Sequence, residues 1–312
     1  MSATLIAVVV ALVLGHLAQS LVVSVRHYGW YQDWLRWLDG RFPAEGIWRG
    51  RWGIAIALLP PLLAVGLFQL ALAEPLFGLA GLAFGIAALF YAWGPRDLDL
   101  DVDAIVDAND SASRRAAATA LWPEGGTPSL DGGALVEAVF RNALRRWFGV
   151  LLWFLLLGPF GALLYRLTAL SAEGESARAL PDETRSGAQT VLALLDWPVT
   201  QLMTLSLALV GNFDTVLGAW RESGGAAFNL DLRFLGAVAR ASVRSELAEE
   251  AADYADDNGS VEAGEAGLPP PPPLTIATGE LPELRDAMSL VWRSLLVWLA
   301  VLALFVIAGW VS

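Results

Sequence analysis

Residues 147–166, WFGVLLWFLLLGPFGALLYR, form an apolar run that is broken in its middle by Gly158-Pro159. Eleven residues precede the break, which is too few to cross a bilayer as a helix, since that takes roughly 20 residues. The run must therefore continue through the break or turn back. Proline lacks an amide donor and glycine loosens the next turn, so backbone groups freed at this depth need cover from protein, water or a ligand. We expect a broken helix surrounded by protein, with an ordinary kinked span as the alternative.

Composition places the chain among membrane proteins. Hydrophobic residues make up 56% of it and charged residues 17%, and the mean hydropathy is +0.53, which is foreign to a soluble domain of this length. We therefore predict an all-α polytopic membrane protein. The chain contains no cysteine, which excludes disulfides, cysteine metal sites and thiol nucleophiles. All 20 of its Lys and Arg positions are arginine, which excludes a Walker A loop, a Schiff-base lysine and a serine–lysine dyad.

The N-terminal part, residues 1–93, is predicted to form transmembrane helices joined by a loop rich in arginine and tryptophan. The predicted spans are residues 4–25, 52–73 and 76–93, with a tight turn at Glu74-Pro75. The loop after the first span carries five arginines against three acids, so the positive-inside rule places it in the cytoplasm. Within it Trp30, Trp34 and Trp37 recur at helical spacing. They predict a helix in the headgroup layer anchored by its rings, with an aromatic-lined ligand groove as the alternative.

Residues 94–146 are predicted to form a cytoplasmic helical segment. Aspartates alternate with apolar residues from Asp97 onward, which indicates either a divalent-cation site or a solvated helix start favoured by the helix dipole. We favour the helix start and predict no metal. A helical apolar stripe then leads to Arg141, Arg145 and Arg146, just before the broken run. These arginines are expected to face lipid head groups, or alternatively a phosphorylated ligand.

The C-terminal half contains a second interrupted apolar segment. Residues 188–210 enclose Asp196-Trp197-Pro198, and an aspartate near a proline at membrane depth predicts a second broken element that faces protein or water. The remaining parts are predicted to be cytoplasmic helices (211–245), a disordered acidic and polyproline linker (246–273) and a C-terminal transmembrane helix (274–312, with its span at 292–310). We thus expect about four full spans, with the broken region 147–210 dipping into the bilayer twice and returning. Six full spans is the alternative.

Four blocks of sequence carry a family resemblance: SASRRAA (residues 111–117), RNALRRWFGVLLWFLLLGPFGALLYR (141–166), VLALLDWPVTQL (191–202) and LVGNFDTVLGAW (209–220). In order and spacing they resemble the AmpE family of bacterial inner-membrane proteins. Those proteins are implicated as modulators of beta-lactamase induction and are paired genetically with a cytosolic muropeptide amidase. AmpE is in turn similar to the CobD/CbiB membrane enzymes, which join cobyric acid to an aminopropanol unit in cobalamin synthesis. The resemblance implies a multi-pass protein of the bacterial inner membrane.

The resemblance also assigns residues. It implies a binding pocket formed by Arg114, Asn142, Tyr165, Arg166, Asp196 and Asp214. It implies structural roles for Gly158, Pro159, Gly161, Pro198 and Trp220. No catalytic residue and no metal ligand is predicted, and no cofactor is assigned. The implied partners are the lipid bilayer, a nucleotide or a cell-wall-derived ligand, and the muropeptide amidase pathway, with no nucleic acid.

Departures from the enzyme pattern bear on function. Where the CobD-like enzymes continue with an Asn-Thr-Leu-Asp run, residues 167–170 are LTAL, and Gln201 stands where an arginine is expected. Binding of phosphates and Mg²⁺ needs several converging carboxylates and bases. We therefore expect a regulatory or sensory membrane protein that acts through a polar pocket at the cytoplasmic face. The alternative is a CobD-like amide-forming enzyme, with Arg166, Arg114 and Asp196 holding a phosphorylated substrate. A transporter ranks last, because no internal repeat is seen.

Overall fold

The computed structural model describes residues 5–11, 27–43, 46–72, 78–94, 97–122, 126–227, 230–231, 233–259 and 281–308. The helices are α3 (Gly29–Arg41), α4 (Gly53–Ala71), α5 (Gly78–Ala92), α6 (Leu98–Val106), α7 (Ser111–Ala118), α8 (Gly132–Ala143), α9 (Gly149–Leu157), α10 (Pro159–Ala172), α11 (Glu175–Arg178), α12 (Asp182–Val210), α13 (Phe213–Glu222), α14 (Arg233–Gly259) and α15 (Pro282–Ile307). The shorter turns are η1 (Ile47–Arg49), η3 (Thr119–Leu121) and the π-helical η4 (Leu144–Phe148). The described residues contain no strand, so the all-α class is confirmed for this part of the chain.

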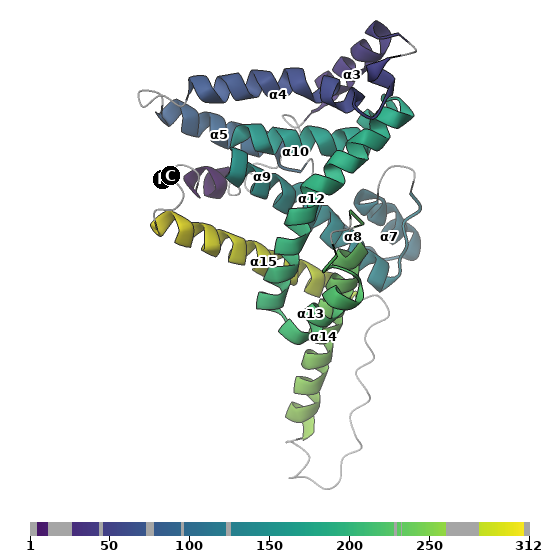
Figure 1. Cartoon of the computed structure of the whole chain (residues 1–312). Coiled ribbons are helices and arrows are strands. Elements are labelled where there is room, and N and C mark those ends of the chain that lie inside the picture. Colours follow the sequence, from purple (N-terminus) through teal and green to yellow (C-terminus); the bar gives the residue numbers. More distant parts are fainter. Residues whose placement is uncertain are drawn as a thin grey trace.

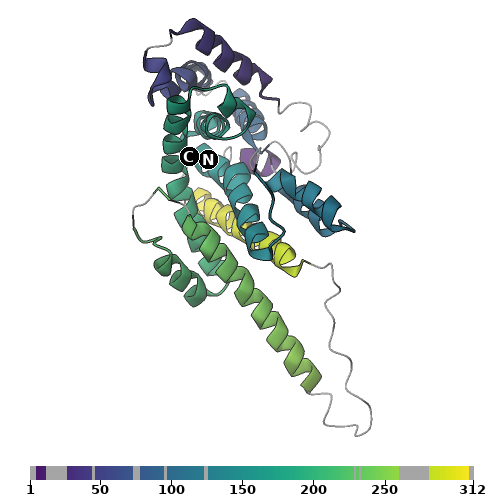
Figure 2. The same ribbon diagram turned by 90° about the vertical axis from the view of Figure 1, so that its right-hand side faces the viewer.

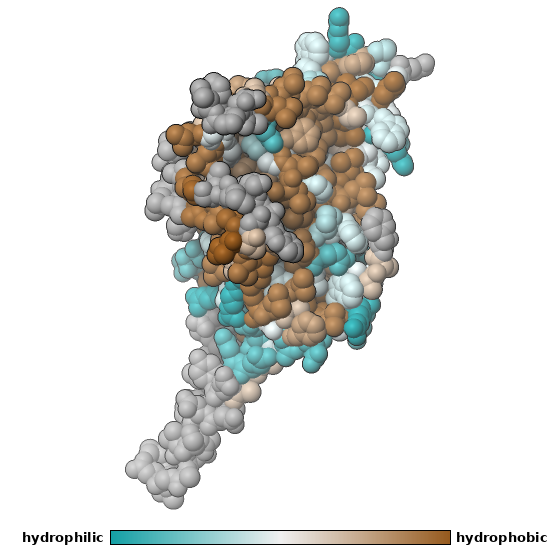
Figure 3. Space-filling model, turned by 60° about the vertical axis from the view of Figure 1, so that its left-hand side comes forward, coloured by the Kyte–Doolittle hydropathy of each residue, from teal (hydrophilic) through white to brown (hydrophobic). Residues whose placement is uncertain are grey.

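Among the described residues, three helices are long and apolar enough to cross a membrane: α4, α12 and α15. The helix α5 is apolar but shorter. α4, α5 and α10 lie side by side, while α12 crosses them obliquely (Figure 1). The candidate spans carry exposed apolar side chains on their outward faces, such as Leu63 and Leu67 in α4 and Leu304 in α15. Figure 3 shows a broad hydrophobic band on one face of the molecule. An exposed apolar surface of this extent supports the predicted membrane class.

The predicted spans correspond to these helices only in part. α4 matches the span predicted at 52–73. α15 begins earlier than the span predicted at 292–310 and ends at Ile307, and residues 309–310 lie outside the described residues. The span predicted at 76–93 corresponds to the shorter α5. Most of the first predicted span, 4–25, and the turn at Glu74-Pro75 lie outside the described residues. Within the described part, α12 has the length and composition of a span but is not among the four that were expected.

The predicted break at Gly158-Pro159 is confirmed, and the chain turns back there. α9 ends at Leu157, Gly158 adopts φ 66° and ψ −151°, and α10 starts with Pro159. The positive φ suits glycine because it has no Cβ. Proline suits the first position of a helix, where an amide donor would have no helical partner. α9 and α10 pack closely against each other, so they form a helical hairpin and not a kinked span.

Gln69 of α4 satisfies backbone groups that this break frees. Its Nε2 donates to the carbonyl oxygen of Leu157 at 3.2 Å, and its Oε1 accepts from the amide of Phe160 at 3.0 Å. Gly161, on the next turn, has no room for a side chain, since a Cβ there would overlap the carbonyl of Trp153. The cover expected for a break at this depth therefore comes from neighbouring protein.

The second predicted break is wrong, because α12 runs without interruption past Pro198. A proline removes one helical hydrogen bond, here the one that would go to the carbonyl of Leu194. Here the indole Nε1 of Trp153 donates to the carbonyl of Leu195 at 3.1 Å. The hydroxyl of Thr200 donates to the carbonyl of Asp196, also at 3.1 Å. The helix therefore continues through the proline, with side-chain bonds on two neighbouring carbonyls, and the segment does not turn back.

The acidic segment predicted as a disordered linker is helical in its first part. α14 extends through residues 246–259, ELAEEAADYADDNG. Alanine, glutamate and leucine favour helix, and here this propensity outweighs the repulsion among the acids. This half of α14 points away from the other helices (Figures 1 and 2). Residues 260–273, with much of the predicted linker and its prolines, lie outside the described residues.

The helix predicted around the three tryptophans is α3, but its indoles do not share one environment. Trp34 donates from Nε1 to the carbonyl of Ala57 in α4 at 3.0 Å. Trp30 donates to the hydroxyl of Tyr91 in α5 at 2.6 Å. Trp37 is the most exposed of the three, at 57%. Two of the indoles therefore hold α3 against α4 and α5, and the role of the rings as anchors in the headgroup layer stays a prediction.

Candidate functional site

A buried polar cluster joins the hairpin to α12. Tyr165 of α10 and Asp196 of α12 are fully buried, and the phenol of Tyr165 donates to Asp196 Oδ1 at 2.6 Å. Arg145 Nη2 lies 3.0 Å from Asp196 Oδ2 and 3.5 Å from Glu173 Oε1. The carboxylate of Asp196 thus has a hydrogen-bond donor and a counter-ion, which offset the cost of burying its charge. Two of the six predicted pocket residues are therefore in direct contact.

A glycine and a π-helical turn shape this cluster. Gly149 lies against the ring of Tyr165, where a Cβ would overlap the phenol. The phenol oxygen is also 3.4 Å from the carbonyl oxygen of Leu144, the first residue of η4. π-Helical turns insert an extra residue into a helix and are frequent at functional sites. Here the turn carries Arg145 and Arg146 next to the hairpin.

Arg145 and Arg146 enter different surroundings. Arg146 pairs with Asp101 of α6 at 2.6 Å, and both side chains are almost fully buried. It also donates to the carbonyl of Ala120 at 2.9 Å. Protein groups therefore hold Arg146, contrary to the expectation that all three arginines before the broken run would meet lipid or a ligand. Arg141 is exposed, as that expectation requires.

Arg166 is buried beside the cluster in a different electrostatic environment. The residue is 4% exposed, and its Nε donates to the carbonyl oxygen of Ala92, at the end of α5, at 2.6 Å. Among the described residues, its Nη2 has no hydrogen-bond partner. Arg145 and Arg146 lie near enough for their positive charges to act on it. Arg166 is therefore a third arginine in one buried region.

A pocket of about 300 Å³ opens beside Arg145, among α8, the end of α10 and the start of α14. Its lining residues are Glu137, Arg141, Leu144, Arg145, Glu173, Asp231, Arg233, Leu235 and Gly236. Glu137 pairs with Arg240, and Asp231 pairs with Arg233, whose hydrogen bonds lower the pKa of the Asp231 carboxyl. Three arginines and three acids thus surround a space suited to a small ligand with an anionic group.

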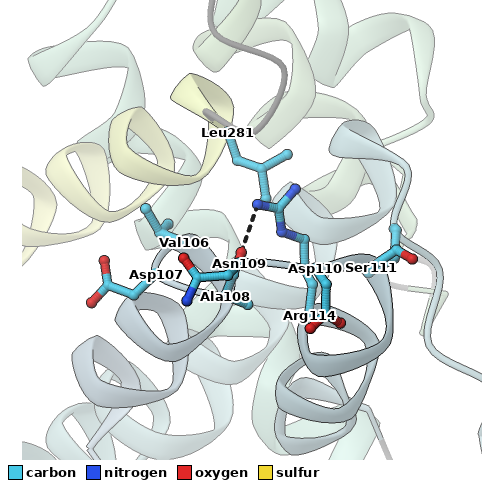
Figure 4. Close-up of a pocket in the computed structure, with 9 residues that line it drawn as sticks. Val106, Asp107, Ala108, Asn109, Asp110, Ser111, Arg114 and Leu281 are labelled. Atoms are coloured by element: carbon cyan, nitrogen blue, oxygen red, sulfur yellow. Dashed lines mark hydrogen bonds between the residues drawn. The ribbon is translucent and has the colours of Figure 1, made fainter.

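Arg114 lies elsewhere. It lines a separate pocket of about 480 Å³ at α6 and α7, where Asp107, Asn109 and Leu281 are among the other lining residues (Figure 4). Its Nη2 donates to the carbonyl of Ala108 at 3.1 Å. The two pockets share no lining residue. The structure therefore does not bring Arg114 into the buried cluster.

Asn142 and Asp214 are also apart from the cluster. Asn142 Nδ2 donates to the carbonyls of Leu121 and Ala138, both at 2.8 Å, and so holds η3 against α8. Asp214 is exposed in the first turn of α13, where the helix dipole favours an acid. Both side chains have local structural explanations, and neither contacts the predicted pocket residues that gather at the hairpin.

Gln201 has a structural role in place of the arginine expected there. It accepts from Trp220 Nε1 at 3.0 Å and donates from Nε2 to the carbonyl of Gly225, also at 3.0 Å. These two bonds tie α12 to the turn after α13. They give a physical basis to the structural role that the resemblance implies for Trp220.

The aspartates at the start of α6 have separate partners. Asp97 caps the helix by accepting from the amide of Asp99 at 3.4 Å. Asp99 Oδ1 accepts from Trp292 Nε1 of α15 at 2.8 Å, and Asp101 pairs with Arg146. The capping contact fits the interpretation of this run as an acidic helix start.

Several residues of this region were not predicted from the sequence. They are Gln69, Asp101, Arg145 as the counter-ion of Asp196, and Tyr31. The hydroxyls of Tyr31 and Ser171 are 2.7 Å apart and hold α3 against the end of α10. Burial raises the pKa of Tyr31, so its phenol stays protonated at neutral pH. The sequence contained one indication of these contacts, the position of Arg145 and Arg146 just before an apolar run. That position does not show that Arg145 pairs with Asp196 and Arg146 with Asp101.

Comparison of the chain with protein-family models, with curated proteins and with solved structures finds no match in any of the three. The resemblance to the AmpE family therefore depends on the sequence motifs.

Proposed function

We propose that this chain is a multi-pass protein of the bacterial inner membrane and acts as a regulatory protein of the AmpE type. It modulates beta-lactamase induction or cell-wall recycling signalling through the pocket beside Arg145, at the cytoplasmic face. The observation that supports this most is the contact of Tyr165 with Asp196. It joins two blocks of the resemblance, GPFGALLYR and LDWP, next to a pocket.

Arg145 offers a physical route from ligand to protein. Its guanidinium lines the pocket and also pairs with Asp196 and Glu173. A ligand that binds Arg145 competes with these carboxylates and so changes how the hairpin packs on α12. A ligand shifts a conformational equilibrium only by its difference in affinity for the two states, and the shared guanidinium supplies such a difference. The proposed ligand is a nucleotide or a cell-wall-derived molecule, and the proposed partner pathway is that of the muropeptide amidase.

Asp196→Asn tests this function in cells. The variant keeps the size of the side chain but removes the charge that pairs with Arg145, so we expect altered induction of beta-lactamase by a beta-lactam. Asp214→Asn is the matched control, because Asp214 is exposed and does not contact the cluster. Membrane levels of both variants are measured by immunoblot. Unchanged induction in a normally expressed Asp196→Asn strain would contradict the proposal.

The arginines of the pocket favour one alternative, a CobD-like enzyme that binds a phosphorylated substrate. Arg141, Arg145 and Arg233 line the same space, and guanidinium groups suit phosphate. Complementation of a strain that lacks the cobalamin amide synthase distinguishes the two functions. We expect no growth without added cobalamin, because residues 167–170 lack the amide and carboxylate of the enzyme pattern. Growth would favour the enzyme.

A further inference from the structure

The chain before α12 and the chain after it meet at one place. Glu173, which follows α10 and precedes α12, lines the pocket of about 300 Å³ beside Arg145. Asp231 and Arg233, which follow α12 and α13, line the same pocket. The flanks of a helix that crosses a bilayer are separated by a hydrocarbon core of roughly 30 Å. By residue 231 the chain is therefore on the face from which α12 began.

The chain has no second crossing with which to return to that face. The described residues between α12 and α14 contain one helix, α13, with ten residues, which is too short to cross a bilayer. α13 also runs back along α12, because Trp220 and, just after α13, Gly225 both bond to Gln201. The C-terminal end of α12 is therefore on the same face as its N-terminal end.

Contacts with α15 agree with this path. Trp298 Nε1 donates to Ser206 Oγ at 3.3 Å. α12 ends beside Leu290, since a Cβ on Gly211 would lie 3.8 Å from that side chain. Leu290 is nearer than Trp298 to the start of α15 at Pro282. The last turn of α12 therefore points toward the start of α15 and not toward its far end.

The start of α12 is held by the loop that precedes α4. The hydroxyl of Thr184 donates to the carbonyls of Trp48 and Gly50. Arg51 Nε lies 3.5 Å from Glu183 Oε2. This loop carries the arginines that the positive-inside rule places in the cytoplasm, so both ends of α12 belong to the predicted cytoplasmic face.

Between its two ends, α12 exposes apolar side chains. They form a leucine row: Leu194, Leu202, Leu205 and Leu209. The hydroxyl-bearing residues nearby, Thr200, Thr204 and Ser206, are buried against protein. From Leu194 to Leu209 the row extends about 22 Å along the helix axis, which is less than the roughly 30 Å of a hydrocarbon core.

We propose that α12 does not cross the membrane, although its length and composition permit it, and lies obliquely within the cytoplasmic leaflet. The leucine row is its lipid-facing surface, and the acyl chains of that leaflet are its partner. Helices that lie in a membrane interface bury their apolar face about 5–10 Å into the boundary between head groups and acyl chains. This placement holds whichever function the pocket serves.

Single cysteines at the two ends test this path, because the wild type contains none. Asp182→Cys lies at the start of α12 and Glu222→Cys at the end of α13, and both positions are exposed. We expect an impermeant maleimide to label both from the same face of sealed vesicles. Leu79→Cys, at the start of α5 and at the far end of the helical layer, is the control for the other face (Figure 1). Labelling of positions 182 and 222 from opposite faces would overturn the proposal.

Depth in the bilayer is the second measurement. Nitroxide labels on Leu202→Cys and Leu205→Cys, within the leucine row, are compared with a label on Leu63→Cys near the middle of α4. All three leucines are exposed, so each variant should keep the fold. Collision rates with oxygen and with a water-soluble nickel chelate give the depths. We expect the α12 labels about 5–10 Å below the head groups and the Leu63 label near the midplane, about 15 Å deep.

Each other depth result contradicts the proposal. Labels on α12 as deep as the label on Leu63 would show a spanning helix. Labels that only the nickel chelate reaches would show that the leucine row faces water. Labels that neither reagent reaches would show that protein covers the row, such as a second copy of the chain.

Discussion

Gly149 and Tyr165 show how single residues decide the packing of the hairpin. The phenol ring is fully buried and occupies the space where a side chain at Gly149 would lie. This close approach places the hydroxyl on Asp196. Glycine is therefore required at position 149 for the space it leaves, since the helix itself would favour alanine.

Gly149→Ala should destabilise the protein by about 1–3 kcal/mol, because overpacking forces the ring of Tyr165 or the backbone of α9 to move. Gly218→Ala in α13 is the matched control. A Cβ there meets no atom within 4 Å, so helix propensity alone acts and should stabilise by about 0.5–1 kcal/mol. Denaturant titration in micelles measures both. Equal effects of the two substitutions would contradict the packing argument.

The pair of Arg146 with Asp101 allows a second prediction at this scale. Asp101→Ala leaves the buried guanidinium without its carboxylate, and loss of one partner of a buried pair costs about 3–5 kcal/mol. Asp33→Ala removes the partner of exposed Arg36 and should cost less than about 1 kcal/mol. Unfolding free energies of the two variants give the comparison. A small loss for Asp101→Ala would show that the buried pair contributes little to stability.

At the scale of elements, the hairpin of α9 and α10 depends on a side chain from another helix. The positive φ of Gly158 and the ring of Pro159 turn the chain. The turn leaves the carbonyl of Leu157 and the amide of Phe160 without helical partners, and Gln69 of α4 binds both. Unsatisfied backbone groups are most unfavourable where water is excluded, so α4 and the hairpin should be stable only together.

Gln69→Leu should destabilise the hairpin by about 1–3 kcal/mol for each backbone group left without a partner. Amide hydrogen exchange of residues 157–161 should become faster, because the turn opens more often. Leu70→Ala is the control on the same turn of α4, since Leu70 is 71% exposed. Faster exchange in the control but not in Gln69→Leu would contradict the role of the glutamine.

At the scale of the whole molecule, α3 and the segment after α10 lie at one end of the helical layer. Tyr31 bonds to Ser171, and Gln32 bonds to Glu175. The start of α5 lies at the opposite end (Figure 1). If α3 is cytoplasmic, as its arginines predict, the segment after α10 is cytoplasmic too, as expected for a hairpin that enters and returns.

Single cysteines test this arrangement, because the wild-type chain contains none. We expect Arg36→Cys and Glu175→Cys to react with an impermeant maleimide only when the cytoplasmic face is accessible. Leu79→Cys, at the start of α5 and 85% exposed, should be labelled from the other face. The unlabelled wild type is the background control. Labelling of positions 36 and 175 from opposite faces would contradict the arrangement.

The sequence by itself determined the all-helical class, the long apolar helices and the break at Gly158-Pro159. All three depend on properties that a short stretch of chain carries: apolar side chains in runs, a glycine that adopts a positive φ, and a proline without an amide donor. The first part of the predicted acidic linker shows the limit of such reasoning. Its charge predicted disorder, whereas its helix propensity prevailed in α14.

Tertiary structure alone decided the rest. Pro198 does not break α12, and on the turn before it an indole from α9 bonds to the carbonyl of Leu195. Arg145 and Arg146 are neighbours in sequence, yet one binds a carboxylate of α12 and the other a carboxylate of α6. Arg114 matches a motif but lines another pocket. The physical reason is common to all three: hydrogen bonds and ion pairs are decided by which distant groups packing brings within about 3 Å, and local sequence does not contain that information.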